Sequence, residues 1–121
     1  MSLTIESQQH ENNVVVIAVH GEITFENSDQ LRDRLDQHCE QNQVRIVIDL
    51  AGLKYMSSAG MGVLVHGLKN TRAKGGDLRL INLNDKMRRV FLITQFTHHF
   101  VVLKNLEEAV ASFASPAESS R

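Results

Sequence analysis

Two adjacent serines, Ser57 and Ser58, are the residues of this chain best placed to do chemistry. They follow the apolar run Val44–Leu50 and stand just before a second apolar run, Val63–Leu68, in a helix-like pattern. A serine at a helix start is a strong N-cap, because its hydroxyl oxygen accepts a hydrogen bond from a free backbone N–H of the first turn. The free N–H groups and the helix dipole also favour an anion. We therefore expect any covalent modification at Ser58, for which a plain N-cap role is the alternative.

Catalysis at Ser58 is the weaker interpretation of this stretch. The G-x-S-x-G turn that presents the nucleophile of many hydrolases is absent, and no Asp or Glu occurs between residues 57 and 65. His66 stands about two turns into the expected helix and points away from its start. A triad partner would have to come from His20 or His98, which are distant along the chain.

The glycines that follow the serines hint at a dinucleotide loop, but the pattern fails. The third glycine of that fingerprint is replaced by Val65, and the connection from Leu50 is too long for its tight turn. Gly60 and Gly62 instead leave room for another protein to approach, which favours a docking surface. The six histidines are scattered, and no Cys or carboxylate completes a metal-ligand set. We expect no cofactor and no metal.

The composition is that of one globular domain. The chain has 121 residues, with 42% hydrophobic and 22% charged residues and a formal net charge of −1. A near-neutral chain has no general attraction for nucleic acid. Cys39 is the only cysteine, which excludes a disulfide framework and fits a reducing compartment. With neither a signal-peptide pattern nor an apolar run of membrane-spanning length, we expect a cytoplasmic protein that binds neither nucleic acid nor membrane.

The first half of the chain predicts a hairpin and then a helix. Two strands, Leu3–Ser7 and Val14–Val19, are joined by a short polar segment, and Gly21 is expected to break the second strand. The pattern from Phe25 to Gln41 is helical, and either Asn27 or Ser28 could cap it. Its buried face is expected to carry Leu31, Leu35 and Cys39.

The second half alternates strands and helices. We expect a central strand at Val44–Leu50, a helix at Ala59–Lys74, a strand at Leu78–Ile81, a helix capped by Asn84, a strand at Phe100–Leu103 and a helix that begins after Asn105. The helix after Asn84 is expected to turn Met87, Val90 and Phe91 inward and Lys86, Arg88 and Arg89 outward. These cations either bind phosphate or an acidic partner, or form a solvated face.

This order, ββαβαβαβα, predicts an α/β fold with a mostly parallel sheet, an N-terminal antiparallel hairpin and helices that cover the sheet. A binding site in such a fold lies beyond the carboxyl ends of the strands. Three segments are expected to meet there: Gly21–Asn27, Ala51–Met61 and Asn82–Asn84. Ser58 therefore lies at the functional edge of the sheet on topological grounds.

The segment Asp49–Gly62, which reads D-L-A-G-L-K-Y-M-S-S-A-G-M-G, resembles the signature of the STAS family. Within that family it resembles the stand-alone anti-sigma factor antagonists. Val14–Glu22 looks like the family's second strand, and Arg88–Phe96 looks like its third helix. The resemblance covers essentially the whole chain. It implies a STAS-like single domain at residues 1–114, which we expect to be followed by a flexible tail at residues 115–121.

The resemblance implies a signalling switch rather than an enzyme. In such proteins the unmodified form binds an anti-sigma factor, often a serine kinase, and is released when the serine matching Ser58 is phosphorylated. A metal-dependent serine phosphatase removes the phosphate. The partner-binding residues implied at the three segments are Glu22, Thr24, Phe25, Ser57, Ser58, Ala59, Gly60, Met61 and Asn84.

Two positions depart from the family pattern. Ser57 stands where the family often has Asp, which removes a negative charge and makes Ser57 an alternative acceptor. Ala51 replaces a common Ser and is expected to change only local packing. The fold also allows a different role, because STAS domains serve as non-catalytic accessory subunits of transporters or as scaffolds in sensory complexes.

Overall fold

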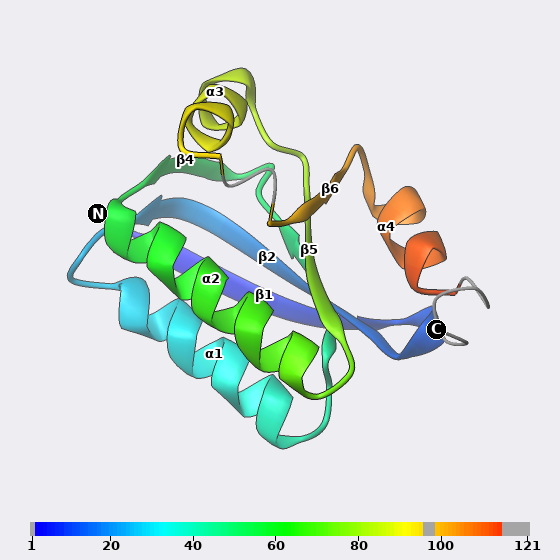
Figure 1. Cartoon of the computed structure of the whole chain (residues 1–121). Coiled ribbons are helices and arrows are strands. Elements are labelled where there is room, and N and C mark those ends of the chain that lie inside the picture. Colours follow the sequence, from blue (N-terminus) through cyan, green and yellow to red (C-terminus); the bar gives the residue numbers. More distant parts are fainter. Residues whose placement is uncertain (1, 96–98, 115–121) are drawn as a thin grey trace.

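The computed structural model describes residues 2–95 and 99–114 as one six-stranded sheet with helices packed on it (Figure 1). The strands are β1 (Leu3–His10), β2 (Val14–Ile23), β3 (Arg45–Asp49), β4 (Leu53–Met56), β5 (Asp77–Ile81) and β6 (Val101–Leu103). The helices are the short 3-10 turn η1 (Glu11–Asn13), α1 (Ser28–Glu40), α2 (Ser58–Ala73), α3 (Asp85–Ile93) and α4 (Leu106–Phe113). Residues 115–121, the expected tail, lie outside the described residues.

The sheet confirms the predicted α/β topology. Its strand order is β1-β2-β3-β5-β6, with β4 paired to β2. Among the described strands, only β1 and β2 pair antiparallel, as the predicted hairpin, whereas β2–β3, β2–β4, β3–β5 and β5–β6 are parallel. The parallel strands are therefore joined by crossovers that carry the helices.

Strand β2 continues past Gly21, which corrects the expectation that this glycine breaks the strand. Gly21 has φ +102°, and the pairing register shifts between Gly21 and Glu22. A Cβ atom at Gly21 would lie 2.1 Å from the carbonyl oxygen of Ser2. The glycine therefore forms an irregularity that redirects the strand, which is a common use of glycine in sheets.

Strand β4 lies between Leu50 and α2, where the sequence predicts only a connection. It pairs with the end of β2, with Glu22 opposite Tyr55 and Ile23 opposite Met56. Strand β3 pairs with the earlier part of β2, so β4 takes over as the neighbour of β2 beyond the register shift. This extra strand brings the backbone directly before Ser57 into the sheet.

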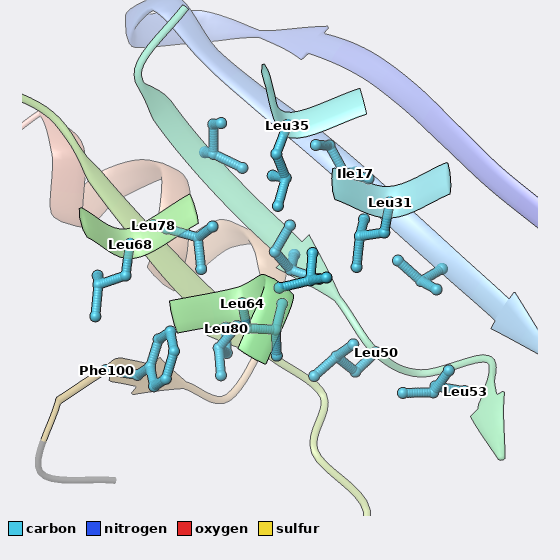
Figure 2. Close-up of a cluster of buried hydrophobic side chains, with 14 of the residues drawn as sticks. Ile17, Leu31, Leu35, Leu50, Leu53, Leu64, Leu68, Leu78, Leu80 and Phe100 are labelled. Atoms are coloured by element: carbon cyan, nitrogen blue, oxygen red, sulfur yellow. The ribbon is translucent and has the colours of Figure 1, made fainter. Parts of the chain in front are cut away.

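Helices α1 and α2 pack against each other on one face of the sheet and cover its main core. The predicted buried positions Leu31, Leu35 and Cys39 of α1 are confirmed. Figure 2 shows the core side chains converging from both helices and the central strands. The fully buried members include Ile17, Leu31, Ile48, Leu64, Leu78 and Leu80.

The opposite face of the sheet is partly covered by α4. Val110 and Phe113 of this helix pack on Val14, Val16 and Val47. Alternate residues of β2 thus face two different cores, which explains why the run Val14–Ile17 is continuously apolar. Within the described residues, no helix is both long and apolar enough to cross a membrane.

A charged cluster stands at the start of β5, next to α4. The Asp77 carboxylate accepts hydrogen bonds from Arg72 Nε and Arg79 Nε, both at 2.9 Å. Arg79 also donates to the Ser112 hydroxyl at 2.7 Å, and its guanidinium lies 4.0 Å from the centroid of the Phe113 ring. The Asp77 and Arg79 side chains are only 12% and 9% exposed, so this pair ties β5 to α4 in a dehydrated setting.

The remaining helix predictions are largely confirmed. The Asn84 side chain caps α3 by accepting from Met87 N at 2.8 Å, and Asn105 caps α4 in the same way. Asn27 occupies the N-cap position of α1 but makes no capping bond with its side chain. The expectation that Val90 points inward is wrong, because its side chain is 40% exposed.

Candidate functional site

The first two predicted segments meet at the end of β2. Ser57 N donates to Ile23 O at 2.8 Å, and Gly21 N donates to Gly52 O at 3.0 Å. Asn27 then closes the turn after β2, because its side-chain amide donates to Glu22 O at 2.9 Å and its Oδ1 accepts from Thr24 N at 2.8 Å. The sheet pairing therefore fixes the backbone at the start of α2.

Asp49 connects the third segment to the other two. Its Oδ1 accepts from Ala51 N and from the Asn82 side-chain amide, both at 3.0 Å. Leu50 N also donates to Ile81 O at 3.1 Å. The three segments therefore share one edge of the sheet, as the topology predicted. The Asp49 carboxylate links the second segment to the third through its two hydrogen bonds.

The two serines have different environments, and the expected capping role of Ser58 belongs to Ser57. The Ser57 side chain is the N-cap of α2 and accepts from Gly60 N at 3.3 Å. Ser57 is 5% exposed, whereas Ser58 is the first residue of the helix and is exposed. No side-chain hydrogen bond engages the Ser58 hydroxyl within residues 2–95 and 99–114. It is the hydroxyl that a second protein can reach.

The N-terminus of α2 is electrostatically suited to an anion. Its first turn contains no acidic residue, so the partial positive charge of the free N–H groups is not offset from within the helix. The positive end of the helix dipole stabilises a nearby negative charge by about 0.3–1 kcal/mol at an exposed position. A phosphate on Ser58 would lie in this favourable field.

Gly60 serves packing rather than access, which corrects the idea that both glycines leave room for a partner. A Cβ atom at Gly60 would lie 2.6 Å from Met56 Cγ and 2.8 Å from Ile23 Cγ2. Gly60 therefore lets the first turn of α2 approach β2 and β4 closely. Gly62, in contrast, has no atom within 4 Å of an added Cβ and is exposed. Only Gly62 keeps the outer surface open.

The other predicted partner-binding residues lie at the same edge with graded exposure. Phe25 is 75% exposed on the turn after β2, and Asn84 is exposed at the start of α3. The partly exposed members are Glu22, Thr24, Ala59 and Met61. Ser57 and Gly60 are buried, so they lie beneath the exposed partner-binding residues.

The sequence analysis missed the contribution of β4 to this surface. Tyr55 is 49% exposed and lies with Lys54 on a strand that was not predicted. Both residues line a pocket together with side chains of α2 and α3. The available signal was Tyr55 itself, an aromatic residue two positions before Ser57 in the signature segment, but its pairing with Glu22 of β2 exists only in the fold.

The structure gives no support to a hydrolase site at Ser58. His20 Nε2 lies 3.3 Å from Glu6 Oε1, and His66 Nε2 lies 2.8 Å from Asp36 Oδ1 between α1 and α2. His98 lies outside the described residues. Burial raises the pKa of the Cys39 thiol, which disfavours its nucleophilic thiolate. Within the described part of the chain, no group of three metal-ligating side chains occurs.

The two serines are expected to respond differently to alanine. Ser57→Ala removes the capping oxygen and should lower the free energy of unfolding by about 1 kcal/mol. Ser58→Ala removes an exposed hydroxyl and should change it by less than about 0.5 kcal/mol. Urea unfolding of both variants checks this. A larger loss for Ser58→Ala than for Ser57→Ala would show that the cap is assigned to the wrong serine.

Comparisons with known proteins agree with the fold and the signature. The family model described as the STAS domain matches residues 4–111. Because this match spans most of the chain, the protein belongs to the STAS domain family.

Two of its relatives are anti-sigma-B factor antagonists. That of Bacillus subtilis is 35% identical over 94 residues, 78% of this chain and 84% of the relative. That of Listeria monocytogenes is 30% identical over 107 residues, 88% of this chain and 93% of the relative.

A solved structure has the same fold. The Bacillus cell fate determinant SpoIIAA in its phosphorylated form superposes with a TM-score of 0.72 at 21% identity, covering 93% of this chain and 100% of that one. At this identity the likeness concerns the fold alone. The resemblance to the anti-sigma factor antagonists, first seen in the segment Asp49–Gly62, is confirmed by the curated relatives.

Proposed function

We propose that this protein is an anti-sigma factor antagonist of a partner-switching pathway, controlled by phosphorylation of Ser58. In its unmodified form it binds an anti-sigma factor that is also a serine kinase, and so frees a sigma factor. The observation that carries the proposal is the exposed Ser58 hydroxyl at the N-terminus of α2, within the signature segment of a chain whose relatives are anti-sigma factor antagonists.

The rigid setting of Ser58 suits an electrostatic switch. Phosphorylation adds about −1.5 to −2 charges at neutral pH. The fold should tolerate this charge, because it lies outside the core and at the positive end of α2. A protein surface packed over Ser58 would instead bury the charge without a partner, which costs several kcal/mol. Complete switching needs about 5.5 kcal/mol of differential affinity, which a buried dianion can supply.

Ser58 is a better acceptor than Ser57 on geometric grounds. Ser57 is 5% exposed, and its hydroxyl oxygen accepts a hydrogen bond from Gly60 N. Phosphorylation of Ser57 would therefore remove the cap of α2 and require the helix start to open. The Ser58 hydroxyl needs no such change. The serine that replaces the usual Asp of the family thus serves as a helix cap, a role that Asp also fills.

The remaining parts of the proposal follow from the same switch. A metal-dependent serine phosphatase returns the protein to its binding form, and the protein itself acts without a catalytic site or cofactor. Residues 1–114 form the STAS domain that carries both states, and the pathway operates in the cytoplasm.

Complex formation tests this function directly. The anti-sigma factors with a serine kinase domain from the same organism would each be purified and mixed with the unmodified protein in the presence of ADP. We expect one of them to form a stable complex on a sizing column and to lose it after incubation with ATP. Failure of every candidate to bind the unmodified protein would contradict the proposal.

A further inference from the structure

A pocket of about 120 Å³ opens between β4, the first turn of α2, and α3. Three methionines from three different elements line it: Met56 of β4, Met61 of α2 and Met87 of α3. The chain has four methionines, and the fourth is Met1. Every internal methionine therefore lines this one pocket.

The chemistry of the lining defines what the pocket accepts. Tyr55, Val90 and Phe91 complete its apolar wall, and Phe91 is held from behind by Phe100, with ring centroids 6.2 Å apart. An apolar cavity of about 150 Å³ can hold benzene, so this pocket has the size of one large aliphatic or aromatic side chain. Methionine side chains are flexible and polarisable, which lets such a site adapt to its occupant.

The rim of the pocket is positively charged. Among the described residues, the two others that line the pocket are Lys54 and Lys86, and none of the described lining residues carries a carboxylate. Arg88 and Arg89 add positive charge on the exposed side of α3, where Asp85 is the single acidic residue of the helix. An apolar side chain flanked by Asp or Glu complements both features, whereas a basic segment would be repelled.

The pocket and the Ser58 hydroxyl belong to one continuous surface. Met61 is three residues after Ser58 on α2, so the two side chains are neighbours on one side of the helix. Tyr55 and Met56 precede Ser58 by three and two residues. A protein that contacts both Ser58 and the neighbouring Met61 side chain therefore also contacts the lining of the pocket.

We infer that this methionine-lined pocket is the anchor site for an apolar side chain of the anti-sigma factor, carried on a segment with flanking acidic residues. The inference rests on the proposed function and adds the chemistry of the contact. The pocket supplies the buried centre of the interface, where binding energy is usually concentrated, and Ser58 lies beside it as the switch.

The three methionines that line the pocket allow an NMR test of whether the anti-sigma factor occupies it. Protein labelled with [methyl-13C]methionine would be titrated with the anti-sigma factor that binds it. We expect the methyl signals of Met56, Met61 and Met87 to shift or broaden on binding. Signals that move with protein concentration alone would instead identify a second copy of this chain as the occupant and overturn the inference.

Substitutions at the pocket give the second test. Val90→Trp fills the pocket and should weaken binding at least 10-fold. Ile93→Trp places the same side chain on the same helix at a position that is 77% exposed and outside the lining, and should leave affinity within twofold. Lys86→Glu reverses the rim charge without touching the core and should weaken binding at least fivefold, which guards against a folding defect of the tryptophan variant.

The failure of this inference is distinguishable from failure of the proposed function. If unmodified protein binds the anti-sigma factor and Ser58→Glu weakens this binding, the function stands. The pocket inference is then overturned if the internal methionine signals do not move and if Val90→Trp and Lys86→Glu bind as tightly as the natural chain. Absence of any complex with the natural chain overturns both.

Discussion

Replacing Ser58 by Glu is expected to weaken binding of the anti-sigma factor about 100-fold without unfolding the protein. Glu carries one negative charge, about half that of a phosphate, so it should supply about half of the 5.5 kcal/mol needed for complete switching. Half of that energy corresponds to about a 100-fold change in Kd. The free energy of unfolding should change by less than about 1 kcal/mol, because an acidic residue in the first turn is favoured by the helix dipole. Calorimetric titration and urea unfolding measure the two quantities.

The matched control for this variant is Ser58→Gln. Gln has nearly the size of Glu but no charge, so its complex should be weakened far less, by about 10-fold or under, through the bulk of the side chain alone. Raising the salt concentration should reduce the difference in affinity between Ser58→Glu and Ser58→Gln only modestly, since a charge buried in an interface is poorly screened. Equal losses for Glu and Gln would show that the surface responds to size and would contradict the electrostatic switch.

The largest effect on stability is expected for Asp77→Ala. This change removes the carboxylate that accepts from both Arg72 and Arg79, and the Arg79 side chain is only 9% exposed. Breaking a buried ion pair by removing one partner costs about 3–5 kcal/mol, so we expect the free energy of unfolding to fall by about 3 kcal/mol. Urea unfolding followed by circular dichroism measures it.

The control for Asp77 is another acid whose contact with a basic side chain is more exposed to solvent. Asp36 contacts His66 at 2.8 Å, but the His66 and Asp36 side chains are 27% and 37% exposed. Asp36→Ala should therefore cost less than about 1 kcal/mol. Asp77 is on the far end of β5 from Ser58, so the folded fraction of Asp77→Ala should still bind the anti-sigma factor. If Asp77→Ala lowers the free energy of unfolding no more than Asp36→Ala does, the structural role given to the charged cluster around Asp77 is contradicted.

The order and type of most elements were predictable because their signals are local. Leu31, Leu35 and Cys39 recur at helical spacing, and Asn84 and Asn105 cap helices as their sequence context indicated. The position of the site was also predictable, because the carboxyl ends of parallel strands share one edge.

Features that depend on distant contacts were not predictable. Strand β4 is four residues long and exists because Glu22 and Ile23 offer it an edge beyond the register shift at Gly21. Two adjacent serines both satisfy the pattern of an N-cap, and the bond between Ser57 N and Ile23 O decides which one takes the role. Neither of these two contacts can be inferred from the secondary-structure propensities of the residues involved.

The pocket beside Ser58 was missed for the same reason. Its three methionines come from β4, α2 and α3, and their convergence follows from the packing of α3 beside the unpredicted strand. Val90 has the spacing of an inward residue after Met87, yet α3 is held by Met87 and Phe91 while Val90 lies at the pocket wall. Helical spacing defines a face but does not determine how deeply that face is buried.

The most direct test of the central claim is to map the phosphate. The natural chain, Ser58→Ala and Ser57→Ala would each be incubated with the kinase that binds the natural chain and with ATP, and then analysed by intact-mass and fragment mass spectrometry. The account predicts one phosphate on Ser58 in the natural chain and in Ser57→Ala, and none in Ser58→Ala. A phosphate mapped to Ser57, or full phosphorylation of Ser58→Ala, would contradict it.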